Sequence, residues 1–266
     1  MIMNLEFKKA AFIVLLSVLV FLPAVKDVGA VEPEEITVSA ASSLKDAFTE
    51  ISKQFEASHP AIKVRLNFGA SGDLQSQIRG GAPVDVFASD AAKEMDELLA
   101  EGRIKWETKS VFASNGMVLI VPASSRVVVS SFEDLTKAKV KKIAVGNPRT
   151  VPAGRYADDV FHYLKIFDDL KNKLMPAENV SQALDYTARG EVDAGVVYAT
   201  DAATRPADVK VVTTAPEGSH TPIDYPIAVV KGTRHEAPAR LFVDFVVSEA
   251  GLKILADNGF RPLRDR

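Results

Sequence analysis

The sequence predicts an α/β protein, because short apolar segments alternate along it with segments of helical periodicity. The apolar segments are rich in β-branched residues and almost continuous in their hydrophobicity, which is typical of strands that are buried on both faces. The segments expected to be strands are Ile36–Ala40, Val64–Phe68, Val84–Ala88, Met117–Val121, Ile143–Val145, Ala194–Tyr198, Val209–Val212 and Tyr225–Val230. Such alternation indicates a layered fold in which helices cover a sheet.

Helices are expected between these strands because apolar residues return at the i, i+3, i+4 and i+7 spacing of one helical face. The clearest series are Leu44, Ala47, Phe48, Ile51 and Phe55, then Ala91, Met95, Leu98 and Leu99, then Ala157, Val160, Phe161 and Leu164. A last helix is expected between Ser248 as its N-cap and Gly259 as its stop. The 236 residues that follow Ala30 suit two lobes joined by extended strands, with a cleft between them.

The first thirty residues have the pattern of a secretory signal peptide. Lys8 and Lys9 precede an apolar run from Ala10 to Val25, and Val28-Gly29-Ala30 supplies the small residues that a signal peptidase reads. The alternative is a membrane anchor, but this run is shorter than the roughly 20 apolar residues of a spanning helix. We therefore expect residues 1–30 to be removed and the mature protein to be soluble and periplasmic.

The composition argues against several classes of protein. A formal net charge of −3 disfavours a nucleic-acid binder, which would carry a strongly basic face. With no cysteine there can be no disulfide, thiolate metal site, cysteine nucleophile or cysteine-linked lipid anchor. The four histidines are too dispersed to indicate a metal cluster; they are His59, His162, His220 and His235.

Motifs for catalysis and nucleotide binding are weak. Gly69-Ala70-Ser71-Gly72 has the wrong spacing for the G-x-S-x-G turn of a serine hydrolase. Neither G-x-x-x-x-G-K-[ST] nor G-x-G-x-x-G occurs in the sequence. An exported enzyme stays an alternative, but it would need an acid, a base or a nucleophile in the cleft.

Small turns recur where an expected strand ends and an expected helix begins. They are Ala41-Ser42-Ser43, Ala70-Ser71-Gly72, Val151-Pro152-Ala153-Gly154 and Asn179-Val180-Ser181. Backbone N–H groups at such points lack partners, and the helix dipole is positive there, so each helix start can bind an anion. A single serine at a helix start is usually a structural cap. The set of four, together with the export signal, indicates a site for an oxyanion.

Five stretches of the sequence resemble the periplasmic molybdate-binding proteins. In order they are ITVSAASSL at 36–44, FGASG at 68–72, GAPVDVF at 81–87, VPAGRYA at 151–157 and GVVY at 195–198. The match runs with few gaps from about Glu35 to the C-terminus. The resemblance implies the substrate-binding subunit of an ABC importer for molybdate, with tungstate as a close mimic. It also implies a type II periplasmic binding protein fold, in which two α/β lobes with mixed sheets enclose a ligand cleft.

The resemblance assigns the ligand contacts position by position. The binding hydroxyls fall on Ser43 and Ser71, the backbone donors on Ala153 and Val180, and the phenolic donor on Tyr198. Molybdenum would be bound only as its oxyanion through these residues, with no cofactor and no catalytic residue. The expected partners are the oxyanion and the permease in the inner membrane, without nucleic acid, and the protein is expected to be a monomer.

The resemblance also sets the expected domain limits. Residues 31–113 and 223–266 would form the first lobe, and residues 114–222 would form the second, so that the chain crosses twice between them. Hinge closure over the ligand is expected for such a protein.

The chemistry of molybdate suits this set of donors. At neutral pH it is a fully deprotonated dianion that only accepts hydrogen bonds, so hydroxyl and N–H groups satisfy it and a carboxylate would repel it. Sulfate or another tetrahedral oxyanion is the alternative ligand, and its rejection would depend on the size of the cavity. A ferric-ion binder is disfavoured because such sites usually have paired tyrosines, and the five tyrosines include no adjacent pair.

Arg155 departs from the expected pattern, because a cation just inside a helix start opposes the helix dipole. We expect its side chain to point to solvent. The alternative is that Arg155 reaches the cleft and strengthens anion binding.

Overall fold

The computed structural model describes residues 33–263, which lie within one compact unit, Glu32–Arg266. The expected signal peptide, residues 1–30, lies outside the described residues. Among residues 33–263, every helix falls short of the length and apolar character needed to traverse a bilayer.

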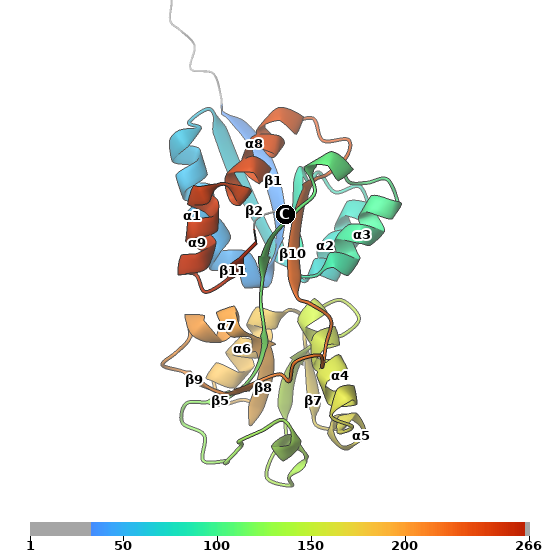
Figure 1. The fold of residues 1–266 in the computed structure, drawn as a ribbon, viewed down its shortest axis with the longest axis vertical. Coiled ribbons are helices and arrows are strands. Elements are labelled where there is room, and N and C mark those ends of the chain that lie inside the picture. The colour runs from blue at the N-terminus through green and yellow to red at the C-terminus, as the bar shows by residue number, and fades with distance from the viewer. Residues whose placement is uncertain (1–32, 264–266) are drawn as a thin grey trace, which may run out of the picture. The chain divides into compact units, whose positions relative to one another are not determined.

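The first sheet has six strands in the order β11-β4-β10-β3-β1-β2. Their bounds are β1 Glu34–Ala41, β2 Ile62–Gly69, β3 Val86–Ala88, β4 Ser110–Ser114, β10 Asp224–Val229 and β11 Arg261–Pro262. Strand β1 runs parallel to β2 and β3, whereas β10 is antiparallel to β3 and β4. Helices cover both faces, with α1 (Lys45–Ser58), α8 (Glu236–Val247) and α9 (Glu249–Asp257) on one side and α2 (Ser71–Arg79) and α3 (Ala92–Ala100) on the other (Figure 1). We call this sheet with its helices the six-stranded half.

The second sheet has five strands in the order β7-β6-β8-β5-β9. Their bounds are β5 Met117–Pro122, β6 Ile143–Gly146, β7 Leu174–Ala177, β8 Ala194–Tyr198 and β9 Val209–Thr214. Helix α4 (Pro152–Tyr163) covers one face, next to α5 (Phe167–Leu170), and α6 (Val180–Ala188) and α7 (Ala199–Thr204) cover the other. Short 3₁₀ turns occur at η1 (Ser42–Leu44), η2 (Trp106–Thr108) and η3 (Glu133–Thr136). We call this sheet with its helices the five-stranded half.

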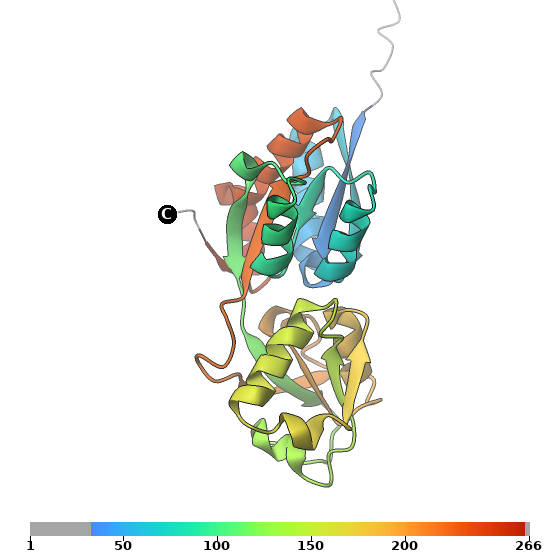
Figure 2. The same cartoon turned by 90° about the vertical axis from the view of Figure 1, so that its right-hand side faces the viewer.

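The chain passes from the six-stranded half to the five-stranded half between β4 and β5, and it returns between β9 and β10. The two crossing segments run side by side (Figure 2). One continuous cluster of buried apolar residues includes members of both halves, among them Phe48 and Phe242 in the first and Val145 and Phe161 in the second. The expected α/β class is confirmed, with two mixed sheets flanked by helices.

Some strands differ from expectation because they lie at sheet edges. Strands β2 and β9 are partly exposed along their length, so burial on both faces is wrong for them. Strands β7 and β11 are the other edges, and the sequence pattern does not predict them because they contain Pro176 and Pro262. Proline is tolerated at an edge, where its missing N–H leaves no gap in the ladder. Strand β4 is not expected either, because it is short and has a serine at each end.

The helix ends follow local sequence signals more closely. The Ser248 hydroxyl accepts a hydrogen bond from the Gly251 N–H at 3.3 Å, as expected of the N-cap of α9. Gly259, after the end of α9, has a φ of +83°, a value that favours glycine. Helix α8 is not expected from the sequence, because its valines and phenylalanines lower helix propensity, and packing onto the sheet decides its structure.

Candidate anion-binding site

The candidate residues follow strands that run parallel to a neighbour in their sheet. Ser43 comes after β1 and Ser71 after β2, while Ala153 follows β6 and Val180 follows β7. Tyr198 is the last residue of β8, which is parallel to β6. The carboxyl ends of parallel strands lie at one edge of their sheet. Each half therefore presents its candidate residues at a single sheet edge.

Four of the candidates stand at helix starts, as the sequence predicts. Ser43 lies in η1, Ser71 and Val180 are the first residues of α2 and α6, and Ala153 is the second residue of α4. The first N–H groups of a helix have no acceptor within it, and the dipole makes them favourable for an anion. Ser71, Ala153 and Val180 are buried, so hydrogen bonds made there are shielded from water.

Turns of the two halves contact each other directly. The Gly72 N–H donates to the Thr150 carbonyl oxygen at 3.0 Å, which places the start of α2 beside the turn before α4. A Cβ on Gly72 would lie 2.7 Å from that oxygen, so the approach requires glycine. The Ser181 hydroxyl donates to the Ser42 carbonyl oxygen at 3.4 Å, which joins the start of α6 to η1.

Two of the candidate donors converge on one carboxylate, that of Asp90. The Ser71 hydroxyl donates to Asp90 Oδ1, and the Asp90 N–H donates to Ser71 Oγ at 3.2 Å. The Tyr198 hydroxyl donates to Asp90 Oδ2 at 3.0 Å. Ser71 and Asp90 belong to the six-stranded half and Tyr198 to the five-stranded half. The carboxylate therefore links the halves and takes hydrogen bonds from two residues assigned to the ligand.

A second polar chain connects Ser43 to the five-stranded half. Ser43 Oγ shares a hydrogen bond of 3.2 Å with the Tyr225 hydroxyl. Asn115 Nδ2, in the segment between β4 and β5, donates to the Tyr225 hydroxyl at 3.1 Å and to Thr200 Oγ1 at 2.8 Å. The Ser43 side chain is thus held by residues that lie at the crossing between the halves.

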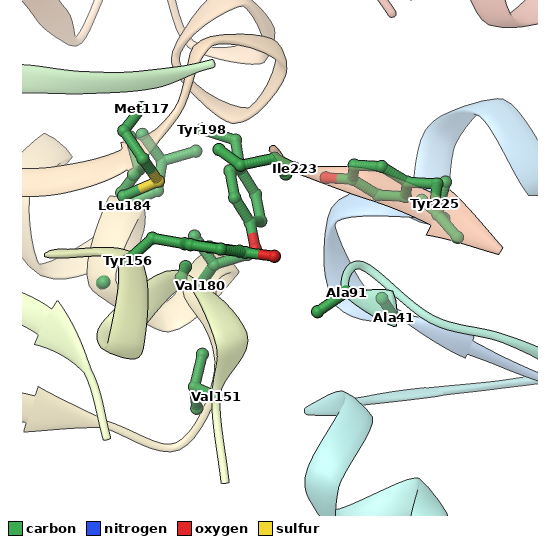
Figure 3. Packing of buried hydrophobic residues seen from close by; sticks show 14 of the residues in the cluster. Ala41, Ala91, Met117, Val151, Tyr156, Val180, Leu184, Tyr198, Ile223 and Tyr225 are labelled. Atoms are coloured by element: carbon green, nitrogen blue, oxygen red, sulfur yellow. The ribbon is translucent and has the colours of Figure 1, made fainter. Parts of the chain in front are cut away.

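Three tyrosines meet beside these contacts. The hydroxyl ends of Tyr156 and Tyr198 point toward one another, and the Tyr225 hydroxyl points toward them from the six-stranded half (Figure 3). The ring centroids are 6.4 Å apart for Tyr156 and Tyr198 and 6.0 Å apart for Tyr198 and Tyr225. Burial, and then the charge of Asp90, raises the pKa of each of these phenols above its usual value. The phenols therefore stay protonated and can donate hydrogen bonds.

The absence of adjacent tyrosines in the sequence does not by itself disfavour a ferric site. The fold brings Tyr156, Tyr198 and Tyr225 together although they lie far apart in the chain. A different observation disfavours iron. Burial raises the pKa of Tyr198 and of Tyr225, so both phenols are protonated in this structure, whereas a tyrosine that ligates ferric ion does so as a phenolate. Protonated phenols suit an oxyanion instead.

The expectation that Arg155 points to solvent is wrong. Its Nη2 lies 2.6 Å from Oε1 of Glu94, and the Glu94 side chain is buried on α3. The pair joins α4 of the five-stranded half to α3 of the six-stranded half. A buried carboxylate offsets the unfavourable position of a cation at a helix start.

Of the five candidates, only Ser43 lines the pocket of about 310 Å³ that lies between η1, α6 and α7. Its walls include Ser42, Ser181 and Thr200, and also the carboxylates of Asp46, Asp185 and Asp201. Ala153, Val180 and Tyr198 are members of the buried apolar cluster. The structure thus links Ser71 to Tyr198 through the Asp90 carboxylate and holds Ser43 through Tyr225, whereas Ala153 and Val180 contribute buried helix starts.

Asp90 and Tyr225 are the residues of this region that sequence reasoning missed. Asp90 follows β3, which like β2 runs parallel to β1, so its position after an expected strand could have marked it. A carboxylate is not a residue that the donor pattern of an oxyanion site predicts. Tyr225 is the second residue of β10, which is antiparallel to β3, and no local sequence signal relates it to Ser43.

Two α/β halves with hydrogen-bond donors where they meet are typical of a solute-binding protein, and the comparison with known proteins assigns the chain to that class. Residues 36–261 match the family described as bacterial extracellular solute-binding protein. The match spans most of the chain, and the protein belongs to this family.

The relatives narrow the class further. The chain is 35% identical to the molybdate-binding protein ModA of Haemophilus influenzae over 85% of this chain and 89% of that protein. It is 36% identical to the molybdate-binding protein ModA of Escherichia coli, over 85% of this chain and 88% of that protein. Among solved structures, the periplasmic molybdate-binding protein of Azotobacter vinelandii has the same fold, with a TM-score of 0.76 and 23% identity over 87% of this chain and all of that one.

Proposed function

We propose that this protein binds molybdate and delivers it to the permease of an ABC importer. The names of the relatives support this ligand. The observation in the structure that carries the proposal is the convergence of the Ser71 and Tyr198 hydroxyls, from opposite halves, on a single anionic group. A place built to donate hydrogen bonds to a carboxylate from both sides can donate them to an oxyanion.

The donor set matches the chemistry of the dianion. Ser43, Ser71 and Tyr198 offer hydroxyl donors, and the starts of α4 and α6 offer the N–H groups of Ala153 and Val180. A hydrogen bond to a charged acceptor contributes roughly 1.5–3 kcal/mol. Five of them in a dry site would support tight binding even after the costs of association. Tungstate, which has the same charge and shape, is proposed as a second ligand.

We propose residues 31–113 with 223–266 as one lobe and residues 114–222 as the other. The first limit falls at the last residue of β4, next to the crossing to β5, and the second falls in the crossing between β9 and β10. Hinge motion there would bring the Ser71 and Tyr198 hydroxyls, which belong to opposite lobes, together around the ligand.

The remaining parts of the proposal concern the setting of the protein. We propose that residues 1–30 are removed on export, that the mature protein is a periplasmic monomer, and that it has neither a cofactor nor a catalytic role. The family of extracellular solute-binding proteins supports export and transport.

Calorimetry of the purified mature protein against molybdate, tungstate, sulfate and phosphate tests this proposal. We expect tight binding of molybdate and tungstate, and no displacement of molybdate by excess sulfate. Binding of sulfate as tight as that of molybdate would overturn the specific ligand. Tighter binding of phosphate would also overturn it. Phosphate is included because hydrogen phosphate carries a proton that it could donate in a hydrogen bond to the Asp90 carboxylate.

A further inference from the structure

The carboxylate of Asp90 already occupies the acceptor positions of two proposed ligand donors. Oδ1 accepts from Ser71 and Oδ2 accepts from Tyr198, so each oxygen takes one hydroxyl. An oxyanion that used the same hydroxyls would have to share this space with a carboxylate, and two anions repel strongly where water is excluded. The feature is thus unexpected for a site that binds a dianion.

The Asp90 side chain is held firmly in place. The residue is 3% exposed, and its N–H donates to Ser71 Oγ at 3.2 Å. The residues on either side of Asp90 are joined to each other. The Ser89 hydroxyl donates to the Ala91 carbonyl oxygen at 2.8 Å and accepts from the Ala91 N–H at 3.1 Å. Rotation of Asp90 out to water would break this packing. Neutralisation by a proton would keep the packing intact.

The charges around Asp90 favour a proton on it. The titratable groups that face it come from several elements, namely Glu94 on α3, Tyr156 on α4, Tyr198 on β8, Asp201 on α7 and Tyr225 on β10, and Arg155 lies next to Tyr156 and Glu94. The guanidinium of Arg155 is already paired with Glu94. Burial, which is the largest cause, and the charge of Glu94 raise the pKa of Asp90 to about 6, against the lowering effect of the Ser71 and Tyr198 hydrogen bonds.

We propose that Asp90 is an affinity-determining residue of the oxyanion site, which competes for Ser71 and Tyr198 as a carboxylate and contributes a donor as a carboxylic acid. This inference rests on the proposed binding of molybdate. In the neutral form, the Asp90 O–H can donate to a ligand oxygen, adding one more donor beside Ser71 and Tyr198. Binding therefore takes one proton from solvent onto Asp90, with no bond to the ligand made or broken.

Calorimetric titration with sodium molybdate between about pH 6.5 and about pH 8.5 tests the inference. For the wild-type protein we expect Kd to rise by about tenfold per pH unit, because each binding event takes up nearly one proton. Repeating the titration in buffers of different ionisation enthalpy measures that proton directly and needs no variant. The Asp90→Asn variant is expected to show a nearly constant Kd and to bind more tightly than wild type at the upper pH.

Two further variants test whether Asp90 is the group that takes up the proton when molybdate binds. Asp168→Asn is a matched change at an exposed carboxylate on α5 and is expected to keep the wild-type slope. Asp201→Asn removes a buried neighbouring carboxyl group and is also expected to keep the slope. Loss of the slope in Asp201→Asn with its retention in Asp90→Asn would overturn the assignment to Asp90.

The inference can fail separately from the proposed function. Tight molybdate binding by the wild type with a Kd independent of pH, and without proton uptake, would overturn the role of Asp90 and leave the proposed function standing. Failure of both the wild type and Asp90→Asn to bind molybdate at any pH would overturn the proposed function together with this inference.

Discussion

The Arg155 guanidinium and the Glu94 carboxylate form an ion pair between the two halves of the protein, with 2.6 Å between Nη2 and Oε1. Glu94 Oε2 has no hydrogen-bond partner among the described residues, so the ion pair with Arg155 is its main compensation for burial. The pair lies close to the proposed ligand donors but is separate from them. Its loss should affect stability before it affects ligand chemistry.

Replacing Arg155 with Ala should destabilise the protein by about 1–3 kcal/mol, because it leaves a buried carboxylate without its partner. The figure is modest because the Arg155 side chain is itself one-quarter exposed. Urea unfolding of the purified protein measures it. Arg189→Ala is the control, since Arg189 is exposed and lies 4.0 Å from Glu191. Equal stabilities of the two variants would contradict the role of the pair.

Tyr198→Phe should weaken molybdate binding by roughly tenfold to a hundredfold, because it removes a hydroxyl donor to a charged acceptor. Calorimetry with sodium molybdate is the measurement. Tyr163→Phe makes the same change at an exposed tyrosine on α4 and should leave Kd unchanged. An unchanged Kd in Tyr198→Phe would remove the phenol from the site.

Gly72→Ala should reduce molybdate affinity by roughly threefold to tenfold, through loss of a hydrogen bond between the halves. The new methyl group would lie 2.7 Å from the Thr150 carbonyl oxygen, so the start of α2 must move away from the turn before α4. Gly80→Ala is a matched control at the end of the same helix, where the nearest contact would be an ordinary 3.4 Å. Equal affinities of the two variants would show that this approach is not needed for binding.

Asp201 should make stability depend on pH. Burial raises the pKa of Asp201 to about 8, and its Oδ2 has no hydrogen-bond partner among the described residues. The folded state therefore holds the proton more tightly than the unfolded state, so this stabilising contribution is complete below the unfolded pKa and is lost as pH rises toward 8. The Tm advantage of Asp201→Asn over wild type should grow between about pH 5 and about pH 8. An advantage that stays constant with pH would contradict the shift.

Molybdate should raise Tm and lower the radius of gyration of the mature protein. At a ligand concentration one hundred times Kd, binding raises the free energy of unfolding by about 2.7 kcal/mol. Thermal unfolding and solution scattering with and without sodium molybdate measure the two effects. A rise in Tm with superimposable scattering profiles would support binding but count against hinge closure.

Local patterns predict much of this fold. The segments around Val38, Leu119 and Val196 lie in strands, and the series ending at Phe55 and at Leu164 mark α1 and α4. These predictions succeed because strand and helix preferences depend on neighbours a few residues apart. They fail at β7 and β11, because each contains a proline, which argues against a strand, and each lies at a sheet edge, where a proline is tolerated.

The sequence by itself determined that helices begin near Ser71, Pro152 and Val180, because caps, proline and the helical period are local features. Only the tertiary structure decided that Asp90 meets Tyr198, that Tyr225 meets Ser43 and that Arg155 meets Glu94. Each of these pairs joins residues far apart in the chain. The contact of Tyr225 with Ser43 depends on the strand order within the six-stranded sheet, and the other two contacts depend on how the two halves pack together. Charge and protonation at the site follow from those contacts, so no local pattern could reveal them.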